Sequence, residues 1–113
     1  MIVILKGKKL NIKKLLGKRI KEIRKSKNLT QDKVAEIINI ETTSLSNIEN
    51  GKYYPTADNL EKIIKVLDIQ PYKLFQFEHL APNDDLQKEI IDLLNKNPER
   101  IKDIYKIVKA LLD

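Results

Sequence analysis

Apolar side chains recur at spacings of three and four along most of the chain, which is typical of amphipathic helices. The first such series begins at Leu15 or Leu16 and predicts a helix that ends near Lys27. A later series, which Thr56 or Asp58 opens, predicts a core helix with Leu60, Ile63, Ile64 and Leu67 on its inner side. Pro71 then starts one further helical turn, over residues 72–75.

Between these two series, residues 30–51 predict two short helices joined by a tight corner. Thr30 is a good N-cap for the first helix, and Asn39, which tolerates left-handed backbone, can end it. The second helix starts at Glu41 or Thr42 and ends at Gly51. The arrangement is that of a helix-turn-helix.

The second of these helices has an outer face of hydroxyl and amide groups that is almost free of charge. It buries little more than Leu45 and Ile48, whereas an ordinary solvated face is rich in Lys and Glu. Asn can make two hydrogen bonds to adenine, and Ser and Thr can bond several bases. The face therefore predicts a reader of base edges in duplex DNA; the alternative is a polar surface helix without a partner. Its members are Thr42, Thr43, Ser44, Ser46 and Asn47.

The order of residues from Leu16 to Phe75 resembles the lambda-repressor-like family (Cro/CI, or xenobiotic-response-element type) of bacterial and phage transcription regulators. The residues that carry the resemblance are 16–24, 29–31, 34–35, 45–51, Pro55 and 60–67. The resemblance implies a five-helix DNA-binding domain. With the helices expected after it, the fold class is all-α: a five-helix head followed by a C-terminal helical hairpin.

The resemblance also implies roles for single residues. By matching position, Gln31 would support a contact with a DNA phosphate. Arg24 and Glu49 occupy positions that form a buried or half-buried ion pair in the family, which would fix the second motif helix against the first helix of the domain. Two unrelated surface charges are the alternative. The residues that would reach base edges are Thr42, Thr43, Ser46 and Asn47.

Three polar residues, Lys52, Tyr53 and Tyr54, lie just beyond the second motif helix, where backbone phosphates would pass. Pro55 follows them and cannot continue a helix. Contact with phosphates and packing of the two Tyr rings on the edge of the core both remain open.

Two further helices are expected over residues 83–95 and 98–112, after a connector at 76–82. Both have an apolar side, and a two-helix hairpin cannot bury this much apolar surface by itself. The hairpin therefore docks on its own head or on a second copy, and a cyclic dimer is the commonest closure. We expect a homodimer whose interface contains Ile101, Ile104, Tyr105, Val108, Leu111 and Leu112.

Positive charge is concentrated in the N-terminal part of the chain, which favours contact with DNA. The formal net charge is +6, but residues 1–30 hold eleven Lys or Arg against Glu22 alone, so the remainder is acidic. Such an asymmetry steers the basic part toward polyanions; a solubilising Lys-rich face is the alternative.

The expected organisation is a basic arm at 1–14, a DNA-binding domain at 15–77 and the hairpin at 78–113. The arm could touch DNA, pair as a strand in a dimer, or result from a misassigned start codon.

Several functional classes are disfavoured by composition. The chain has no Cys and one His, His79, so metal sites, disulfides and nucleophilic catalysis lack their usual residues. No cofactor, catalytic residue or small-molecule ligand is expected. The longest apolar run, residues 1–5, is far shorter than the roughly 20 residues of a membrane span, so a cytoplasmic bacterial or phage protein is expected.

The sequence thus predicts a DNA-binding transcription regulator, and more specifically a repressor that binds a palindromic operator as a homodimer. An antitoxin or restriction-modification controller that regulates its own operon is one alternative. A helical protein-interaction adaptor without DNA binding is another.

Overall fold

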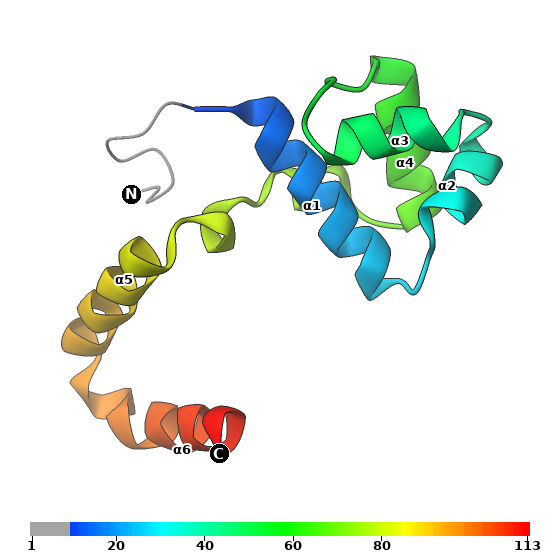
Figure 1. Cartoon of the computed structure of the whole chain (residues 1–113). Coiled ribbons are helices and arrows are strands. Elements are labelled where there is room, and N and C mark those ends of the chain that lie inside the picture. The colour runs from blue at the N-terminus through cyan, green and yellow to red at the C-terminus, as the bar shows by residue number, and fades with distance from the viewer. Residues whose placement is uncertain (1–9) are drawn as a thin grey trace.

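The computed structural model describes residues 10–113, and within them every regular element is helical. Five elements form a head, and the rest of the chain extends away from it as a tail (Figure 1). The head consists of α1 (Ile12–Ser26), α2 (Gln31–Ile38), α3 (Thr42–Glu49), α4 (Ala57–Leu67) and the 3-10 helix η2 (Pro71–Phe75). The predicted five-helix head is confirmed, with a 3-10 turn as its fifth member.

The tail contains both expected helices, but the hairpin is open. Its elements are the 3-10 helix η3 (Glu78–Leu80), α5 (Asn83–Lys96), the 3-10 helix η4 (Pro98–Arg100) and α6 (Ile101–Leu112). The two long helices meet at η4 and diverge from it at an open angle, so their apolar sides are not packed together (Figure 1). The all-α class is confirmed, and the tail has the shape of an elbow.

Helix α1 begins at Ile12, earlier than the apolar spacing predicted. Asn11 is its N-cap: the side-chain oxygen accepts a hydrogen bond from the Lys14 backbone N–H at 3.2 Å. Residues 12–14, which we assigned to the basic arm, are therefore helical. The greater part of that arm, residues 1–9, lies outside the described residues.

Three corners of the head are formed by non-glycine residues in left-handed conformation. Asn28 and Asn39 each have a φ of 59°, and Asp68 has a φ of 53°. Asn39 ends α2 as predicted, and the Thr30 side chain caps the start of that helix by accepting a hydrogen bond from the Lys33 N–H at 3.1 Å. Short polar side chains tolerate this conformation best, so these positions turn the chain without Gly.

The core of the head receives side chains from all five elements, so each helix is held by the others. α3 contributes only two apolar residues, which leaves most of its surface outside. The core consists of Leu16, Ile20, Ile23, Val34, Ala35, Ile38, Leu45, Ile48, Ile63, Leu67 and Leu74.

Candidate nucleic-acid interface

Helix α3 is divided into a buried inner side and an accessible outer side. Leu45, Ile48 and Glu49 are buried, and they face the other helices of the head. The five side chains that we expected to read bases all lie outside this buried set. Thr43 and Ser44 are exposed, and the half-buried members are Thr42, Ser46 and Asn47.

Two glycines allow α1 to cross α3 at backbone contact. A Cβ atom at Gly17 would lie 2.4 Å from the Ile48 carbonyl oxygen and 2.6 Å from that of Glu49. Gly51 has a φ of 75°, and a Cβ there would lie 2.7 Å from the Cα of Lys14. Only glycine fits both places, and this close approach fixes the C-terminal end of α3 against α1.

Arg24 and Glu49 form a bidentate ion pair between α1 and α3. The Arg24 Nε donates to Glu49 Oε2 at 2.7 Å, and Nη2 donates to Oε1 at 3.0 Å. Nη1 donates to the Leu29 carbonyl at 2.7 Å, so one guanidinium also holds the loop before α2. The two side chains are 7% and 0% exposed. Removing either partner would leave a buried charge unpaired.

Gln31, the first residue of α2, joins this cluster. Its Nε2 donates to Glu49 Oε1 at 2.9 Å, the same oxygen that accepts from Arg24. The resemblance assigned Gln31 to a phosphate contact and gave no sign of this bond. The contact could not be derived from spacing, because 18 residues and a corner separate the two side chains. The backbone N–H groups at the start of α2 remain suited to a phosphate, since such groups have no partner within their helix.

The loop after α3 presents Lys52, Tyr53 and Tyr54 to the surface. The Tyr rings are 54% and 44% exposed, while Pro55 is buried. Lys52 Nζ lies 5.5 Å from the centroid of the Tyr53 ring, within cation–π range. The backbone N–H groups of Lys52 and Tyr53 donate to the Asn47 carbonyl at 2.9 and 3.4 Å. The loop therefore folds back onto the C-terminal end of α3 and exposes one cation and two hydroxyls there.

Glu41 occupies the N-cap of α3, and its side chain makes no capping hydrogen bond. In most helices a Ser, Thr, Asp or Asn at this position accepts from the N2 or N3 backbone N–H. At the α3 N-terminus the Glu41 carbonyl accepts from the Ser44 and Leu45 N–H groups at 3.0 and 3.2 Å, and no side chain caps the remaining N–H groups.

Over residues 10–113, no three His, Cys, Asp or Glu side chains gather closely enough to hold a metal ion. None of the helices in that range has both the length and the apolar character that crossing a membrane requires.

Comparison with known proteins decides the family. Residues 17–79, more than half of the chain, match a family model described as a helix-turn-helix domain. The chain is a lambda-repressor-like helix-turn-helix protein. The match begins within α1 and ends within η3, and it covers all of α2, α3 and the loop after α3. The family resemblance seen in the sequence is confirmed.

Curated relatives of this helix-turn-helix protein are regulators of gene expression. The control protein C.BamHI of Bacillus amyloliquefaciens is 41% identical over 68 residues, which are 59% of this chain and 84% of that protein. The immunity repressor protein of Bacillus phage phi105 is 34% identical over 94 residues, 80% of this chain and 65% of its own length. The predicted DNA-binding regulatory function is confirmed at the level of the family, and neither name denotes an enzyme.

Solved structures show the same fold. The restriction-modification controller protein C.AhdI from Aeromonas hydrophila superposes with a TM-score of 0.55 at 26% identity, over 57% of this chain and 98% of its own. The SinR/SinI complex matches with a TM-score of 0.53 at 28% identity, over 84% of this chain and 98% of the matched chain. The second match covers more of the chain than the head alone.

Proposed function

We propose that this helix-turn-helix regulator binds a palindromic operator as a homodimer and represses transcription by occupying the promoter region. The observation that carries the proposal is the division of α3. Its inner side is held by Leu45 and Ile48 in the core, by the close approach at Gly17 and by the Arg24–Glu49 pair. Its outer side is left to hydroxyl and amide groups. A helix of this kind can enter the major groove without giving up any contact of the fold.

Base reading is assigned to the outer side of α3. Asn47 is the member that can make two hydrogen bonds to one adenine, and Thr43 can pack its methyl group on thymine. Contacts with the phosphates would set the register of α3 on the duplex. Lys52, with the hydroxyls of Tyr53 and Tyr54, would supply them from the loop after α3. The N-terminus of α2 would supply further phosphate contacts.

The homodimer is supported by the tail. Large apolar side chains on α6 stay exposed: Leu111 is 79% exposed, and Tyr105 is 63% exposed. Contiguous exposed apolar surface of this kind marks an interface with another molecule. A second copy is the occupant we commit to, because two heads on a palindrome match the twofold symmetry of such a dimer. The assigned interface is Ile101, Ile104, Tyr105, Val108, Leu111 and Leu112.

A second candidate function, a restriction-modification controller, is favoured by one observation. The fold match to the restriction-modification controller C.AhdI extends over 98% of that chain. A controller would act on its own operon, so adjacent methyltransferase and endonuclease genes would separate it from a stand-alone repressor. In either case the proposed target is bacterial or phage DNA, and a protein that acts on it would work in the cytoplasm.

Selection of bound sequences from a random duplex library, with the full-length protein, tests the proposal. We expect an inverted repeat whose half-sites lie about one helical turn apart, 10 to 10.5 base pairs from centre to centre. Sedimentation of the protein with the selected duplex should give two chains per duplex. A protein-interaction adaptor would enrich no sequence and would not prefer duplex DNA to other polyanions at moderate salt, and that result would contradict the proposal.

A further inference from the structure

We propose that Arg19 and Glu22 of α1 are positioning residues that fix the direction in which the tail leaves the head, and so set the half-site spacing that a dimer can occupy. The contacts lie within one chain. The consequence for DNA rests on the proposed function.

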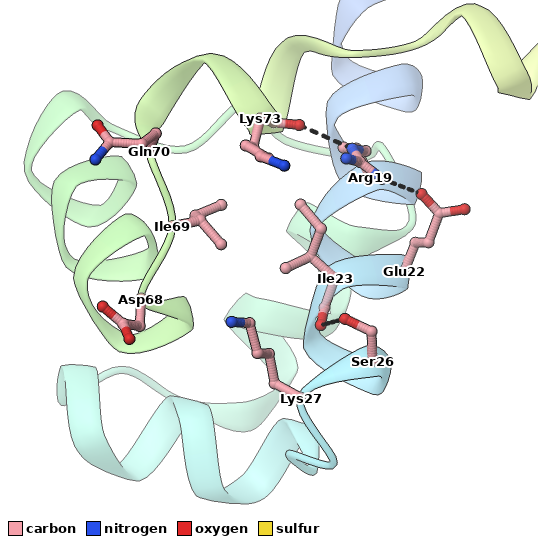
Figure 2. Close-up of a pocket in the computed structure, with 9 residues that line it drawn as sticks. All are labelled: Arg19, Glu22, Ile23, Ser26, Lys27, Asp68, Ile69, Gln70 and Lys73. Atoms are coloured by element: carbon pink, nitrogen blue, oxygen red, sulfur yellow. Dashed lines mark hydrogen bonds and ion pairs between the residues drawn. The ribbon is translucent and has the colours of Figure 1, made fainter.

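Arg19 joins α1 to the end of the head and the start of the connector. Its Nε donates to the Lys73 carbonyl at 2.8 Å, and Nη2 lies 3.4 Å from the Gln76 side-chain oxygen. Figure 2 shows the guanidinium between that carbonyl and Glu22, at one edge of a hollow of about 550 Å³ between α1 and the segment from Asp68 to Lys73. The Arg19 side chain is 14% exposed, so most of its surface contacts the protein.

Glu22 extends the link to η3. It accepts from Arg19, and its Oε1 lies 2.7 Å from His79 Nε2. Because an ionised carboxylate can only accept, His79 donates from Nε2. Burial alone would raise the pKa of Glu22, but the hydrogen bonds from His79 and Arg19 outweigh it and hold that pKa below its ordinary value. The carboxylate is therefore ionised at neutral pH and ties together residues 57 positions apart in the sequence.

The connector between these contacts has little freedom to bend. Leu74 is fully buried before it, Phe77 packs against the core, and Ala81 is 5% exposed at its far end. Residues 76–82 contain no Gly and end at Pro82. With Arg19 and Glu22 holding its middle, the connector can transmit the orientation of α1 to α5.

The tail acts as a lever, so small changes at the connector matter. Helix α5 has 14 residues. A swing of about 15° would move its far end by about 5 Å, because a helix of that length spans about 21 Å. One base pair of duplex rises about 3.4 Å. A loosened connector would therefore let the second head reach several spacings in place of one.

The first experiment measures the position of the tail directly. The chain has no Cys, so spin labels can be attached after Glu61→Cys on α4 and Asn95→Cys on α5, both at exposed positions. Labelled chains are diluted in unlabelled protein, so that only distances within one chain are detected. Glu22→Ala, His79→Ala and Arg19→Ala should each widen the distance distribution about twofold, as expected when a hinge is released.

Two control variants separate positioning from a general effect. His79→Gln keeps a donor near the position of Nε2 and should retain the narrow distribution. Asp92→Asn removes an exposed ion pair with Lys96 (2.8 Å) within the tail alone and should also leave the distribution narrow. An unchanged width in Glu22→Ala and His79→Ala, which alter exposed side chains and should fold, would overturn the proposal.

The second experiment measures spacing on duplexes that carry the two selected half-sites at different separations. The unaltered protein should favour one spacing by about tenfold, and Glu22→Ala should reduce that preference below about threefold with no change in affinity for a single half-site. Full spacing preference in the variant would overturn the proposal, whatever the distances show. If the unaltered protein binds no duplex, the proposed function fails, and the distance measurement alone decides whether these residues position the tail.

Discussion

Glu49 accepts hydrogen bonds from two side chains that are distant in sequence, Arg24 and Gln31, and it is fully enclosed by the head. Replacing it with Ala would leave the Arg24 charge buried and unpaired. We expect Glu49→Ala to lower the free energy of unfolding by about 3 to 5 kcal/mol in urea denaturation. The exposed Glu61→Ala on α4 is the matched control and should stay within about 0.5 kcal/mol. A loss below about 1 kcal/mol in Glu49→Ala would contradict the burial of this pair.

Glu22 gives the stability of the protein a defined pH dependence. Because its folded pKa is depressed, the carboxylate stabilises the native state above its ordinary pKa of 4.5, and this contribution is lost as the pH falls through the folded pKa. Arg19 and His79 contact the carboxylate, and Lys27, Asp68 and Lys73 line the same hollow. The melting temperature of Glu22→Gln should therefore depend less on pH than that of the unaltered protein between about pH 5 and 3. If the melting temperatures of the two proteins fall equally with pH over this range, the prediction is wrong.

Asn47 is the residue on α3 whose loss should alter specificity most clearly. Asn47→Ala removes a side chain that can bond adenine twice, at a cost of roughly 1 to 3 kcal/mol of discrimination at one base pair of each half-site. Competition binding with single-base variants of the selected operator measures this. Asn95→Ala, an exposed Asn on α5, is the control. Equal weakening on operator and random duplex would show that Asn47 does not read a base.

At the scale of elements, the crossing of α1 over α3 depends on Gly17. An Ala there would place its Cβ against two backbone carbonyls, which cannot rotate away as a side chain could. We expect Gly17→Ala to cost about 1 to 3 kcal/mol of stability and to weaken operator binding, because α3 must move outward. Lys18→Ala, at the next and exposed position, should do neither. Unchanged stability in Gly17→Ala would mean that the two helices can separate without cost.

Apolar spacing was sufficient to predict the helices of the head because each buries one side in a shared core. It also predicted α5 and α6, although neither contributes a buried residue. The same spacing failed at the start of α1, where the determinant is a single hydrogen bond that the Lys14 N–H donates to the Asn11 side-chain oxygen. It also failed to show that the tail is open. Whether two amphipathic helices close on one another depends on the angle of their junction at η4, and periodicity carries no information on that angle.

Around α3, the sequence predicted which side chains lie on the outer side of the helix, but it did not predict the contacts between elements. Spacing on one helix separates the outer Thr43 and Asn47 from the buried Leu45 and Ile48. Spacing along one helix does not predict contacts between elements. The bond from Gln31 to Glu49 and the link from Glu22 to His79 join distant parts of the chain. Nothing in the local sequence marks them, because the same residue types are common on solvated surfaces.

For the whole molecule, the tail should decide the oligomeric state. The double change Ile104→Asp and Val108→Asp would place charge in the apolar side of α6. We expect a monomer by sedimentation, with a folded head, and a loss of operator affinity of about a hundredfold, since the second head no longer binds intramolecularly. Lys102→Asp and Lys109→Asp, at exposed polar positions of the same helix, control for added charge. A persistent dimer would place the interface in the head or in residues 1–9.

The way in which α3 is attached to the head has an evolutionary consequence. Its attachment to the head uses Leu45, Ile48 and Glu49 with the two glycines, and none of the outer side chains takes part in the buried Arg24 cluster. Substitutions at the exposed outer positions Thr43 and Ser44 should therefore cost little folding stability, within about 0.5 kcal/mol each. A lineage can then change its operator one contact at a time while every intermediate stays folded. The same separation would let an engineer graft the outer residues of another regulator onto this head and transfer that regulator's target sequence.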